Sequence, residues 1–406
     1  MTGKHLILGV TGGIAIYKVP ELISRLRKQG LGVEVIMTES ATKFITPLTF
    51  REVSANPVHT RMFDSEIDWK VEHIALAKKA DGLAVIPATA NLIGKVAGGI
   101  ADDLLTTTIM ATAAPKLIAP AMNAGMFANP MLQRNLKMLA ELGYTIVGPD
   151  SGRLLCGDEG QGRLATLEEL ELNIQRLLTS QDLAGTTVLV TAGGTREPID
   201  PIRYLGNGSS GKMGHMLARA AFKRGARVLL VTTLPEYAPR AQGIEVFSVN
   251  TTGEMRTAVL ELAGKAAVII KAAAPADFSP AETAPRKIKK REVGSDLILK
   301  LTANPDILLE LGQAKRPDQI LVGFAAETND LRENALEKLN RKNLDLIIGN
   351  LVYANAGVGM GADRNQVTIF SRTETLDLPE MSKPELADEI LEYIIRYRIQ
   401  GFLNQS

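Results

Sequence analysis

Cysteine is almost absent from this sequence, since Cys156 is the single one among 406 residues. A lone cysteine cannot form a disulfide within the chain, and chains without disulfides are typical of reducing compartments. No apolar run is long enough to cross a membrane, and the first residues lead into a short apolar strand rather than a signal peptide. The composition therefore predicts a cytoplasmic protein that acts without a membrane.

Aromatic residues are also scarce, and the net charge is close to zero. Phe, Trp and Tyr make up 4% of the chain, and 46 Lys and Arg residues offset 45 Asp and Glu residues for a formal net charge of +1. Nucleic-acid-binding proteins carry a basic footprint, and single-strand binders add aromatic stacking surfaces. The sequence therefore argues against a nucleic-acid partner.

What the chain does contain, twice, is an apolar strand that runs into a glycine turn. LILGVTGGIA begins at residue 6, and TVLVTAGGT begins at residue 187. Strand-like and helix-like segments alternate after each start, which is the pattern of a doubly wound parallel sheet. We expect an α/β protein with two Rossmann-like domains, residues 1–180 and 187–406, joined by the short polar segment 179–185.

Apolar periodicity predicts helices over residues 14–29, 92–112 and about 207–224, each after a predicted strand. A further helix start is predicted near residue 304, with Asn304 as the N-cap and Asp306 in the first turn.

In the first half, small and polar residues follow three predicted strands: residues 9–14 (GVTGGI), 87–91 (PATAN) and 119–123 (APAMN). The first stretch is not G-x-G-x-x-G, so the sequence gives little support to NAD binding. Hydroxyls and helix starts at the second could hold a phosphate, and the asparagine of the third could bind a carboxylate or a ring carbonyl. Because small turn residues are common at strand ends, each stretch alone is weak evidence.

Two single residues of the first half have an ordinary and a functional interpretation. His73 lies at the start of a predicted amphipathic helix, where a lone histidine is usually a surface or capping residue. Cys156 could be a small buried hydrophobe. Its segment, residues 151–163 (SGRLLCGDEGQGR), is rich in glycine and charge, which favours a flap over a site.

The second half offers an anion site without a P-loop. Residues 207–213 (NGSSGKM) place small residues at the predicted start of a helix, where backbone N–H groups and the helix dipole favour an anion. Lys212 is followed by Met213 and not by Ser or Thr, which excludes the P-loop motif. Residues 286–291 (RKIKKR) are a basic run of the kind that is usually a solvated face. These residues predict an anion-binding α/β domain and leave the nucleobase open.

Taken together, the motifs resemble known enzymes. GVTGGIAIYK, the His73 helix, PATAN, PAMN and LLCGDEGQGRL resemble the flavin-dependent cysteine decarboxylases, while SSGKMG, KIKK and GFAAET resemble the phosphopantothenoylcysteine synthetases. Over residues 4–400 the chain resembles the bacterial bifunctional coenzyme A biosynthesis family, in which a phosphopantothenate–cysteine ligase is fused to a phosphopantothenoylcysteine decarboxylase.

For the first half, the resemblance implies an FMN-dependent flavoprotein domain that decarboxylates 4′-phosphopantothenoylcysteine to 4′-phosphopantetheine. His73 is implied as the catalytic residue beside the flavin, Asn123 as the group that holds the substrate carboxylate, and Cys156 as the proton donor. The implied FMN-binding residues are Gly12, Gly13, Ile14, Thr38, Thr89, Asn91, Thr106 and Met122.

For the second half, the resemblance implies a nucleotide-binding ligase domain that joins 4′-phosphopantothenate to cysteine through an acyl-cytidylate, with CTP as co-substrate and Mg²⁺ bound at Asp277. Asn207 and Lys287 are implied to act on the acyl-cytidylate. The implied CTP-binding residues are Ala273, Ala274, Asp277, Lys287, Asn304, Pro305, Asp306, Ile307, Phe324, Lys338 and Lys342. Two positions depart from the family pattern: Gly208 stands where a bulky residue is usual, and Gly194 where proline is frequent.

The resemblance also implies a homo-oligomer, with trimeric packing of the first domain and dimeric packing of the second, which together give a dodecamer. Two other functions remain as alternatives. One is a flavin-binding regulatory protein that kept the fold and lost catalysis; the set of His73, Asn123, Cys156, Asn207 and Lys287 argues against it. The other is an NAD-dependent dehydrogenase, against which the missing G-x-G-x-x-G argues.

Overall fold

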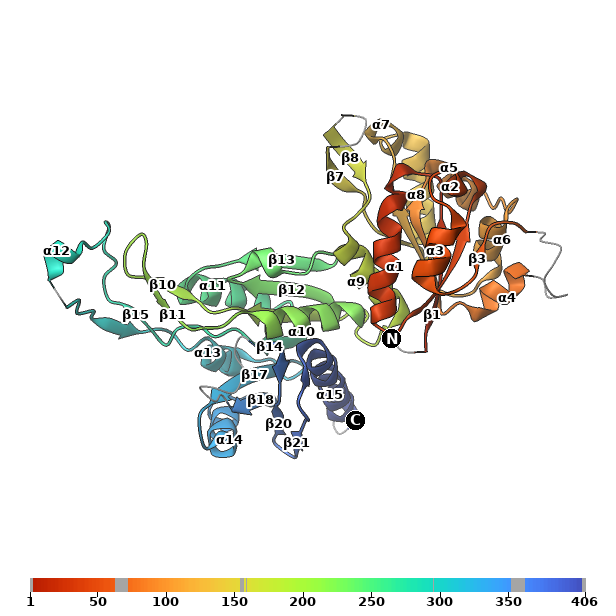
Figure 1. The fold of residues 1–406 in the computed structure, drawn as a ribbon. Helices are drawn as coiled ribbons and strands as arrows, with labels where there is room; N and C mark the ends of the chain where they lie inside the picture. The colour runs from red at the N-terminus through yellow and green to blue at the C-terminus, as the bar shows by residue number, and fades with distance from the viewer. Residues whose placement is uncertain are drawn as a thin grey trace. The chain divides into compact units, whose positions relative to one another are not determined.

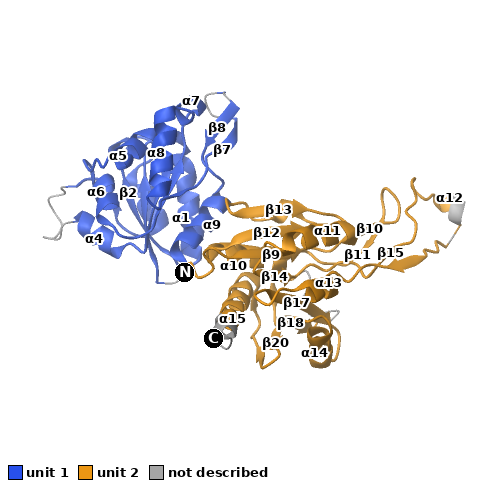
Figure 2. Ribbon diagram, turned by 180° about the vertical axis from the view of Figure 1, so that it is seen from behind, with its two compact units in different colours: residues 1–180 blue, residues 181–406 orange. Residues whose placement is uncertain are grey.

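The structure is a computed structural model that describes residues 3–62, 72–153, 157, 159–294, 296–351 and 362–403. Cys156 lies outside the described residues. The chain divides into two compact units, Met1–Ser180 and Gln181–Ser406 (Figure 2). No helix within the described residues is both long and apolar enough to cross a membrane.

Unit 1 is built on a six-stranded sheet with the order β3-β2-β1-β4-β5-β6. Its strands are β1 (His5–Val10), β2 (Gly32–Met37), β3 (Val58–His59), β4 (Gly82–Ala88), β5 (Lys116–Pro120) and β6 (Thr145–Ile146). Every neighbouring pair is parallel. The strand order reverses between β1 and β4, and in such sheets a ligand crevice forms there, at the carboxyl ends of the strands.

Helices cover both faces of this sheet (Figure 1). They are η1 (Ile14–Lys18), α1 (Val19–Lys28), α2 (Glu39–Thr42), α3 (Pro47–Ser54), α4 (Glu72–Lys79), α5 (Ala90–Ala97), α6 (Leu104–Ala111), α7 (Ala124–Phe127), α8 (Pro130–Glu141) and α9 (Leu167–Leu178). Leu6 and Leu8 of β1 pack into one apolar cluster and Ile7 into another, because successive side chains of a strand point to opposite faces. Burial on both faces explains why the strand is a continuous apolar run.

Two helix predictions for unit 1 were wrong. The single helix expected over residues 92–112 is two helices, because Gly98 and Gly99 follow the end of α5 and Asp103 caps the start of α6. The helix expected over residues 14–29 begins instead as a 3₁₀ turn, η1, and α1 continues it.

The segment predicted as a flap loop contains a hairpin of β7 (Asp150–Arg153) and β8 (Glu159–Arg163).

Unit 2 has an eight-stranded sheet with the order β13-β12-β9-β14-β17-β18-β20-β21. Its strands are β9 (Thr187–Ala192), β12 (Arg227–Thr232), β13 (Ile244–Ser248), β14 (Val268–Lys271), β17 (Ile320–Glu327), β18 (Leu346–Leu351), β20 (Thr368–Ser371) and β21 (Thr375–Asp377). The first six in this order are parallel, and β20 and β21 add antiparallel pairs at one edge. Both units thus confirm the predicted doubly wound α/β class.

The main helices of unit 2 are α10 (Lys212–Lys223), α11 (Thr252–Ala263), α13 (Ile307–Ala314), α14 (Leu331–Arg341) and α15 (Lys383–Leu403), with short helices η2 (Pro235–Tyr237) and α12 (Lys290–Val293). Three two-stranded ribbons complete it: β10 (Arg196–Pro198) with β11 (Tyr204–Gly206), β15 (Phe278–Pro280) with β16 (Leu301–Ala303), and β19 (Arg364–Asn365) with β22 (Met381–Ser382). Figure 1 shows β15 and α12 extending away from the sheet of their own unit; we call the described residues from 278 to 303 the arm.

Two helix starts in unit 2 also differ from prediction. α10 begins at Lys212 and not at Asn207, because Gly211 adopts a left-handed conformation with φ of 68° and ends the loop before it. α13 is capped by Asp306, whose side chain accepts a hydrogen bond from the backbone N–H of Leu309. Asn304 is therefore not the N-cap; its amide donates to the carbonyl oxygen of Ala276.

Candidate functional site

Unit 1 has a cavity of about 780 Å³ at the carboxyl ends of β1, β4 and β5. Its lining includes six of the predicted site residues: Gly12, Gly13, Ile14, Thr89, Met122 and Asn123. The structure therefore brings the turns after three strands together in one place.

A buried threonine that the sequence reasoning missed fastens two of these turns. The Thr11 hydroxyl donates to the carbonyl oxygen of Pro87 at 2.7 Å and accepts from the backbone N–H of Thr89 at 3.1 Å. Next to it, a Cβ on Gly13 would meet no heavy atom closer than 3.8 Å, so this turn leaves open space above the backbone. A ligand can therefore approach the chain closely at Gly13.

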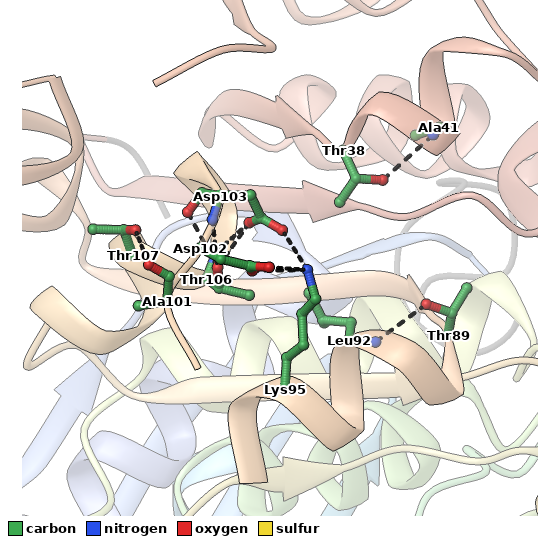
Figure 3. Close-up of polar contacts among 10 residues, drawn as sticks. All are labelled: Thr38, Ala41, Thr89, Leu92, Lys95, Ala101, Asp102, Asp103, Thr106 and Thr107. Carbon is green, nitrogen blue, oxygen red and sulfur yellow. Dashed lines mark hydrogen bonds and ion pairs between the residues drawn. The ribbon is translucent and has the colours of Figure 1, made fainter. Parts of the chain in front are cut away.

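Three of the predicted threonines are engaged in helix caps (Figure 3). Thr38 accepts from the backbone N–H of Ala41, and Thr89 from that of Leu92. A capping hydroxyl that accepts an N–H bond keeps its own proton for an acceptor on a ligand. Thr106 is different, because it is 2% exposed and its hydroxyl donates to Asp103 within a capping box.

Asn123 is held at the mouth of the cavity by the start of α7 and by the hairpin. Its Oδ1 accepts from the N–H of Gly125 at 2.8 Å. The neighbouring Met122 donates its N–H to the carbonyl oxygen of Gly162 in β8 at 3.0 Å. A Cβ on Gly162 would lie 2.3 Å from the Met122 carbonyl oxygen, so the close approach of the hairpin requires glycine.

Three basic side chains line the same cavity: Lys18, Arg153 and Arg163. Burial and then the charge of Arg163 lower the pKa of Lys18, against the opposing effect of Asp150. Cations held close enough to repel one another favour an anion between them. Sequence reasoning gave none of the three a role, although Arg153 and Arg163 lie in the predicted flap and Lys18 ends the motif GVTGGIAIYK.

His73 does not line this cavity. It lies half-buried at the start of α4, and Thr38, Asn91 and Thr106 are likewise outside the cavity lining. The cavity of a single chain therefore contains Asn123 without His73.

Unit 2 has a larger cavity, of about 1050 Å³, at the carboxyl ends of its central strands. Ten predicted residues line it: Asn207, Ala273, Ala274, Asp277, Asn304, Pro305, Asp306, Ile307, Phe324 and Lys342. Lys338 and Lys287 do not. The ammonium group of Lys338 is paired with Glu327, and Lys287 is an exposed residue of the arm.

Glycines allow the loops around this cavity to approach one another. Gly193 has a φ of 89°, and a Cβ there would lie 2.1 Å from the Thr233 hydroxyl oxygen. A Cβ on Gly194 would lie 2.6 Å from the Asn207 carbonyl oxygen, whereas Gly208 has nothing within 4 Å. Of the two departures from the family pattern, Gly208 leaves space unfilled, and Gly194 permits a closer contact between loops.

Charge in this cavity is mainly positive. Its lining includes five basic side chains, Lys212, Lys271, Arg341, Lys342 and Lys383, against the carboxylates of Asp277 and Asp306. Lys342 pairs with Asp306 at 2.8 Å. Burial would raise the pKa of Asp306, but its hydrogen bonds with Lys342 and the Leu309 N–H, together with the charges of Lys342 and Lys271, lower that pKa.

The described residues contain no group of three or more His, Cys, Asp or Glu side chains that could hold a metal ion. Mg²⁺ in nucleotide sites is ordinarily bound by one or two carboxylates together with substrate phosphates. The single carboxylate of Asp277, exposed in the cavity, is compatible with that arrangement.

Comparison with known proteins agrees with this two-part geometry. A family model described as Flavoprotein matches residues 1–179, and one described as DNA/pantothenate metabolism flavoprotein C-terminal domain matches residues 183–397. The chain is 46% identical over 399 residues to the coenzyme A biosynthesis bifunctional protein CoaBC of Bacillus subtilis (strain 168), with 97% of each chain covered. It is 43% identical over 401 residues to that of Escherichia coli (strain K12), with 98% of each covered. The chain belongs to the CoaBC family.

Solved structures related to the two halves are also found. The C-terminal domain of a CoaBC protein is 34% identical, covering 56% of this chain and 100% of that one, with a TM-score of 0.45. A PPC decarboxylase complexed with pantothenoylaminoethenethiol is 32% identical, covering 42% of this chain and 96% of that one, with a TM-score of 0.39.

Within this CoaBC-family chain, sequence reasoning missed several lining residues of the larger cavity. Lys271 had a visible signal, because it is a charge that ends the otherwise apolar run Val268–Ile270. Lys383 had no such signal in the sequence, because it lies at the start of α15, far along the chain from most of the other cavity residues.

Proposed function

We propose that this chain condenses 4′-phosphopantothenate with cysteine and then decarboxylates the product to 4′-phosphopantetheine. The observation that carries the proposal is the pair of polar cavities, each at the carboxyl edge of its own doubly wound sheet, in a chain of the CoaBC family. Residues 1–180 would form the decarboxylase and residues 187–406 the ligase.

The ligase reaction suits the basic cavity of unit 2. A carboxylate does not react with an amine at neutral pH, so the phosphopantothenate carboxylate first attacks the α-phosphate of CTP and pyrophosphate leaves. The cysteine amine then attacks the mixed anhydride and CMP leaves. Lysine side chains and Mg²⁺ at Asp277 would neutralise the phosphate charge that these steps develop.

The loops of the cavity would position the nucleotide. The cavity is lined by Ala273, Ala274, the turn from Asn304 to Ile307, and Phe324, which would surround the nucleotide, and by Lys342, which would add positive charge. Asn207 and Lys287 would act on the acyl-cytidylate, and Lys338 would assist from its pair with Glu327.

The cavity of unit 1 fits a phosphate-bearing ring cofactor, because its open turn at Gly13 adjoins Thr89, which caps α5, and three cations line the same cavity. Gly12, Gly13, Ile14, Thr89 and Met122, all in the lining of this cavity, would hold FMN. Bound FMN would supply the electron sink for decarboxylation by accepting electrons from the cysteine end of the substrate. Asn123 would hold the departing carboxylate, His73 would move a proton at the reacting end, and Cys156 would return a proton while the hairpin excludes water.

The placement of two predicted catalytic residues supports a homo-oligomer. His73 and Lys287 both lie outside the cavity of their own unit, so we propose that neighbouring copies complete each site. Both units expose large apolar side chains: Tyr17 lines the first cavity, and Ile298, 92% exposed, lies on the arm. Trimeric contacts through unit 1 and dimeric contacts through unit 2 would together give a dodecamer.

Two variants test the decarboxylase roles. Anaerobic mixing of the Cys156→Ser protein with 4′-phosphopantothenoylcysteine should bleach the flavin and then stall, because a hydroxyl is a far weaker acid than a thiol of pKa about 8.5. His73→Asn should leave the flavin yellow. Normal turnover of Cys156→Ser would refute the proton-donor role, and a wild-type protein that binds flavin without turnover would favour the regulatory alternative.

A further inference from the structure

Lys271 is a buried cation at the centre of the unit 2 cavity. It is the last residue of β14, a strand whose other members are apolar and buried, and only 6% of its surface is exposed. It lines the cavity together with the Asn207–Gly211 loop and the Asn304–Ile307 turn. The fold therefore buries most of this side chain and places it in the lining of the cavity.

No hydrogen bond or ion pair is found for the Lys271 ammonium group within the described part of the chain. The charged groups that face it are Lys342, from the C-cap of α14, and Asp306, from the N-cap of α13. Asp306 is already committed, because it accepts from Lys342 at 2.8 Å and from the N–H of Leu309 at 3.1 Å. Lys271 thus faces an ion pair that is complete without it.

This environment penalises the charged form of the lysine. Burial, followed by repulsion from Lys342, lowers the pKa of Lys271 to about 7, although Asp306 acts in the opposite direction. Burying a charged ammonium group without a partner is costly, and a cavity residue whose pKa is strongly shifted by burial and a neighbouring charge is a candidate for a functional site. The cost points to a function for this side chain.

The missing partner should be an anion. A neutral acceptor would hydrogen-bond the ammonium group but would not offset the charge of Lys342, whereas a phosphate oxygen does both. The excess of basic side chains in the cavity favours the same class of ligand.

We propose that Lys271 binds a phosphate oxygen of the nucleotide triphosphate and holds it beside Lys342. This inference rests on the proposed ligase function of the cavity. It makes Lys271 a nucleotide-binding residue whose side chain no sequence motif of the chain had indicated.

The assignment has two consequences of opposite sign for Lys271→Met, which keeps the length of the side chain and removes its charge. The unliganded protein should become more stable, with unit 2 melting roughly 2–4 °C higher, because the desolvation cost disappears. Affinity for CTP at pH 6.5 should fall by about tenfold to a hundredfold, because a charge-assisted hydrogen bond is lost. If Lys271 had a purely structural role, its replacement by Met would lower the stability of the protein and leave its affinity for CTP unchanged.

Proton uptake gives a readout that separates binding from packing. At pH 8 the free lysine is mostly neutral, so binding of the anion should draw a proton onto Lys271. Calorimetric titration of CTP in two buffers with different ionisation enthalpies should therefore show greater proton uptake for the wild type than for Lys271→Met. Lys265→Met, which removes an exposed lysine outside the cavity, should match the wild type in every measurement.

The experiment titrates the full-length wild type, Lys271→Met and Lys265→Met with CTP and with tripolyphosphate, which presents the anion without the base. We expect Lys271→Met to weaken both. If the wild type binds CTP and Lys271→Met binds it equally well, the inference is overturned and the proposed function stands. If the variant weakens CTP and leaves a measurable tripolyphosphate affinity unchanged, the phosphate assignment is wrong. Failure of the wild type to bind CTP would overturn the proposed ligase function itself.

Discussion

The amide nitrogen of Asn207 donates a hydrogen bond to the carbonyl oxygen of Pro275 at 2.9 Å. The same nitrogen lies 3.3 Å from the carbonyl oxygen of Ala274. These contacts join the loop before α10 to the loop after β14, and both loops line the cavity of unit 2. Asn207 therefore fixes the shape of the cavity as well as presenting a polar group to it.

Asn207→Asp should slow ligation at least about tenfold, because a carboxylate has no proton to donate and would repel both carbonyl oxygens. Some pyrophosphate release from CTP should remain, since the cationic side chains of the cavity are unchanged. Gln242→Glu adds the same charge at an exposed site before β13 and should have no effect. Wild-type ligation by Asn207→Asp would place the reaction elsewhere.

Asp200 anchors the arm that carries Lys287. Its buried carboxylate accepts from the N–H of Ile288 at 3.2 Å and from the Arg203 guanidinium at 2.6 Å. Burial would raise the pKa of Asp200, but these bonds and those from the loop backbone hold it well below its usual range. Asp200→Ala should release the arm and lower ligation by about tenfold, while calorimetry should show nearly unchanged CTP affinity. If Asp200→Ala lost CTP affinity and ligation rate equally, the Asp200 carboxylate would support the cavity itself and not only the arm.

Gly162→Ala should separate the two activities. The added Cβ would lie 2.3 Å from the Met122 carbonyl oxygen, so the hairpin must move away from Asn123. We expect decarboxylation to fall at least about tenfold and ligation to stay unchanged, because the substitution is confined to unit 1. Gly94→Ala, in the interior of α5 with nothing within 4 Å, is the matched control and should be neutral or stabilising by about 0.5–1 kcal/mol. Normal decarboxylation by Gly162→Ala would show that the hairpin position is not critical.

His59 predicts a pH dependence for the stability of unit 1. Its Nε2 lies 2.9 Å from Glu34, its Nδ1 contacts Glu72, and Glu34 also binds Lys79. Burial would lower the pKa of His59, but hydrogen bonds with Glu34 and then Glu72 outweigh burial and raise it. Burial would likewise raise the pKa of Glu34, but its bonds with His59 and Lys79 lower it to about 2.

Because the folded-state pKa of His59 is raised, its stabilisation is complete below the unfolded value of about 6.5 and is lost as pH rises through the folded value. His59→Asn should cost about 1.5–3 kcal/mol in the free energy of unfolding at pH 6 and distinctly less at pH 9. Urea unfolding of both proteins at the two pH values checks this. A cost that is equal at both values would mean that His59 acts by packing alone.

The alternation of strands and helices was predictable because the central strands β1, β4, β9 and β14 are buried on both faces and small residues follow β1 and β9. Helix boundaries were less so: a capping box at Asp103 divides one apolar stretch into two helices, and a left-handed Gly211 delays the start of α10. Turn residues of the cavities were predictable because they follow strands directly. Lys383 was not, since its proximity to the cavity of unit 2 depends on how distant segments pack.

The most direct test incubates the purified full-length protein with 4′-phosphopantothenate, cysteine, CTP, Mg²⁺ and FMN and identifies the products by mass spectrometry. The proposed function predicts CMP, pyrophosphate, carbon dioxide and 4′-phosphopantetheine, with 4′-phosphopantothenoylcysteine accumulating when FMN is withheld. A sample that binds flavin and CTP but forms neither 4′-phosphopantothenoylcysteine nor 4′-phosphopantetheine would contradict the proposed function.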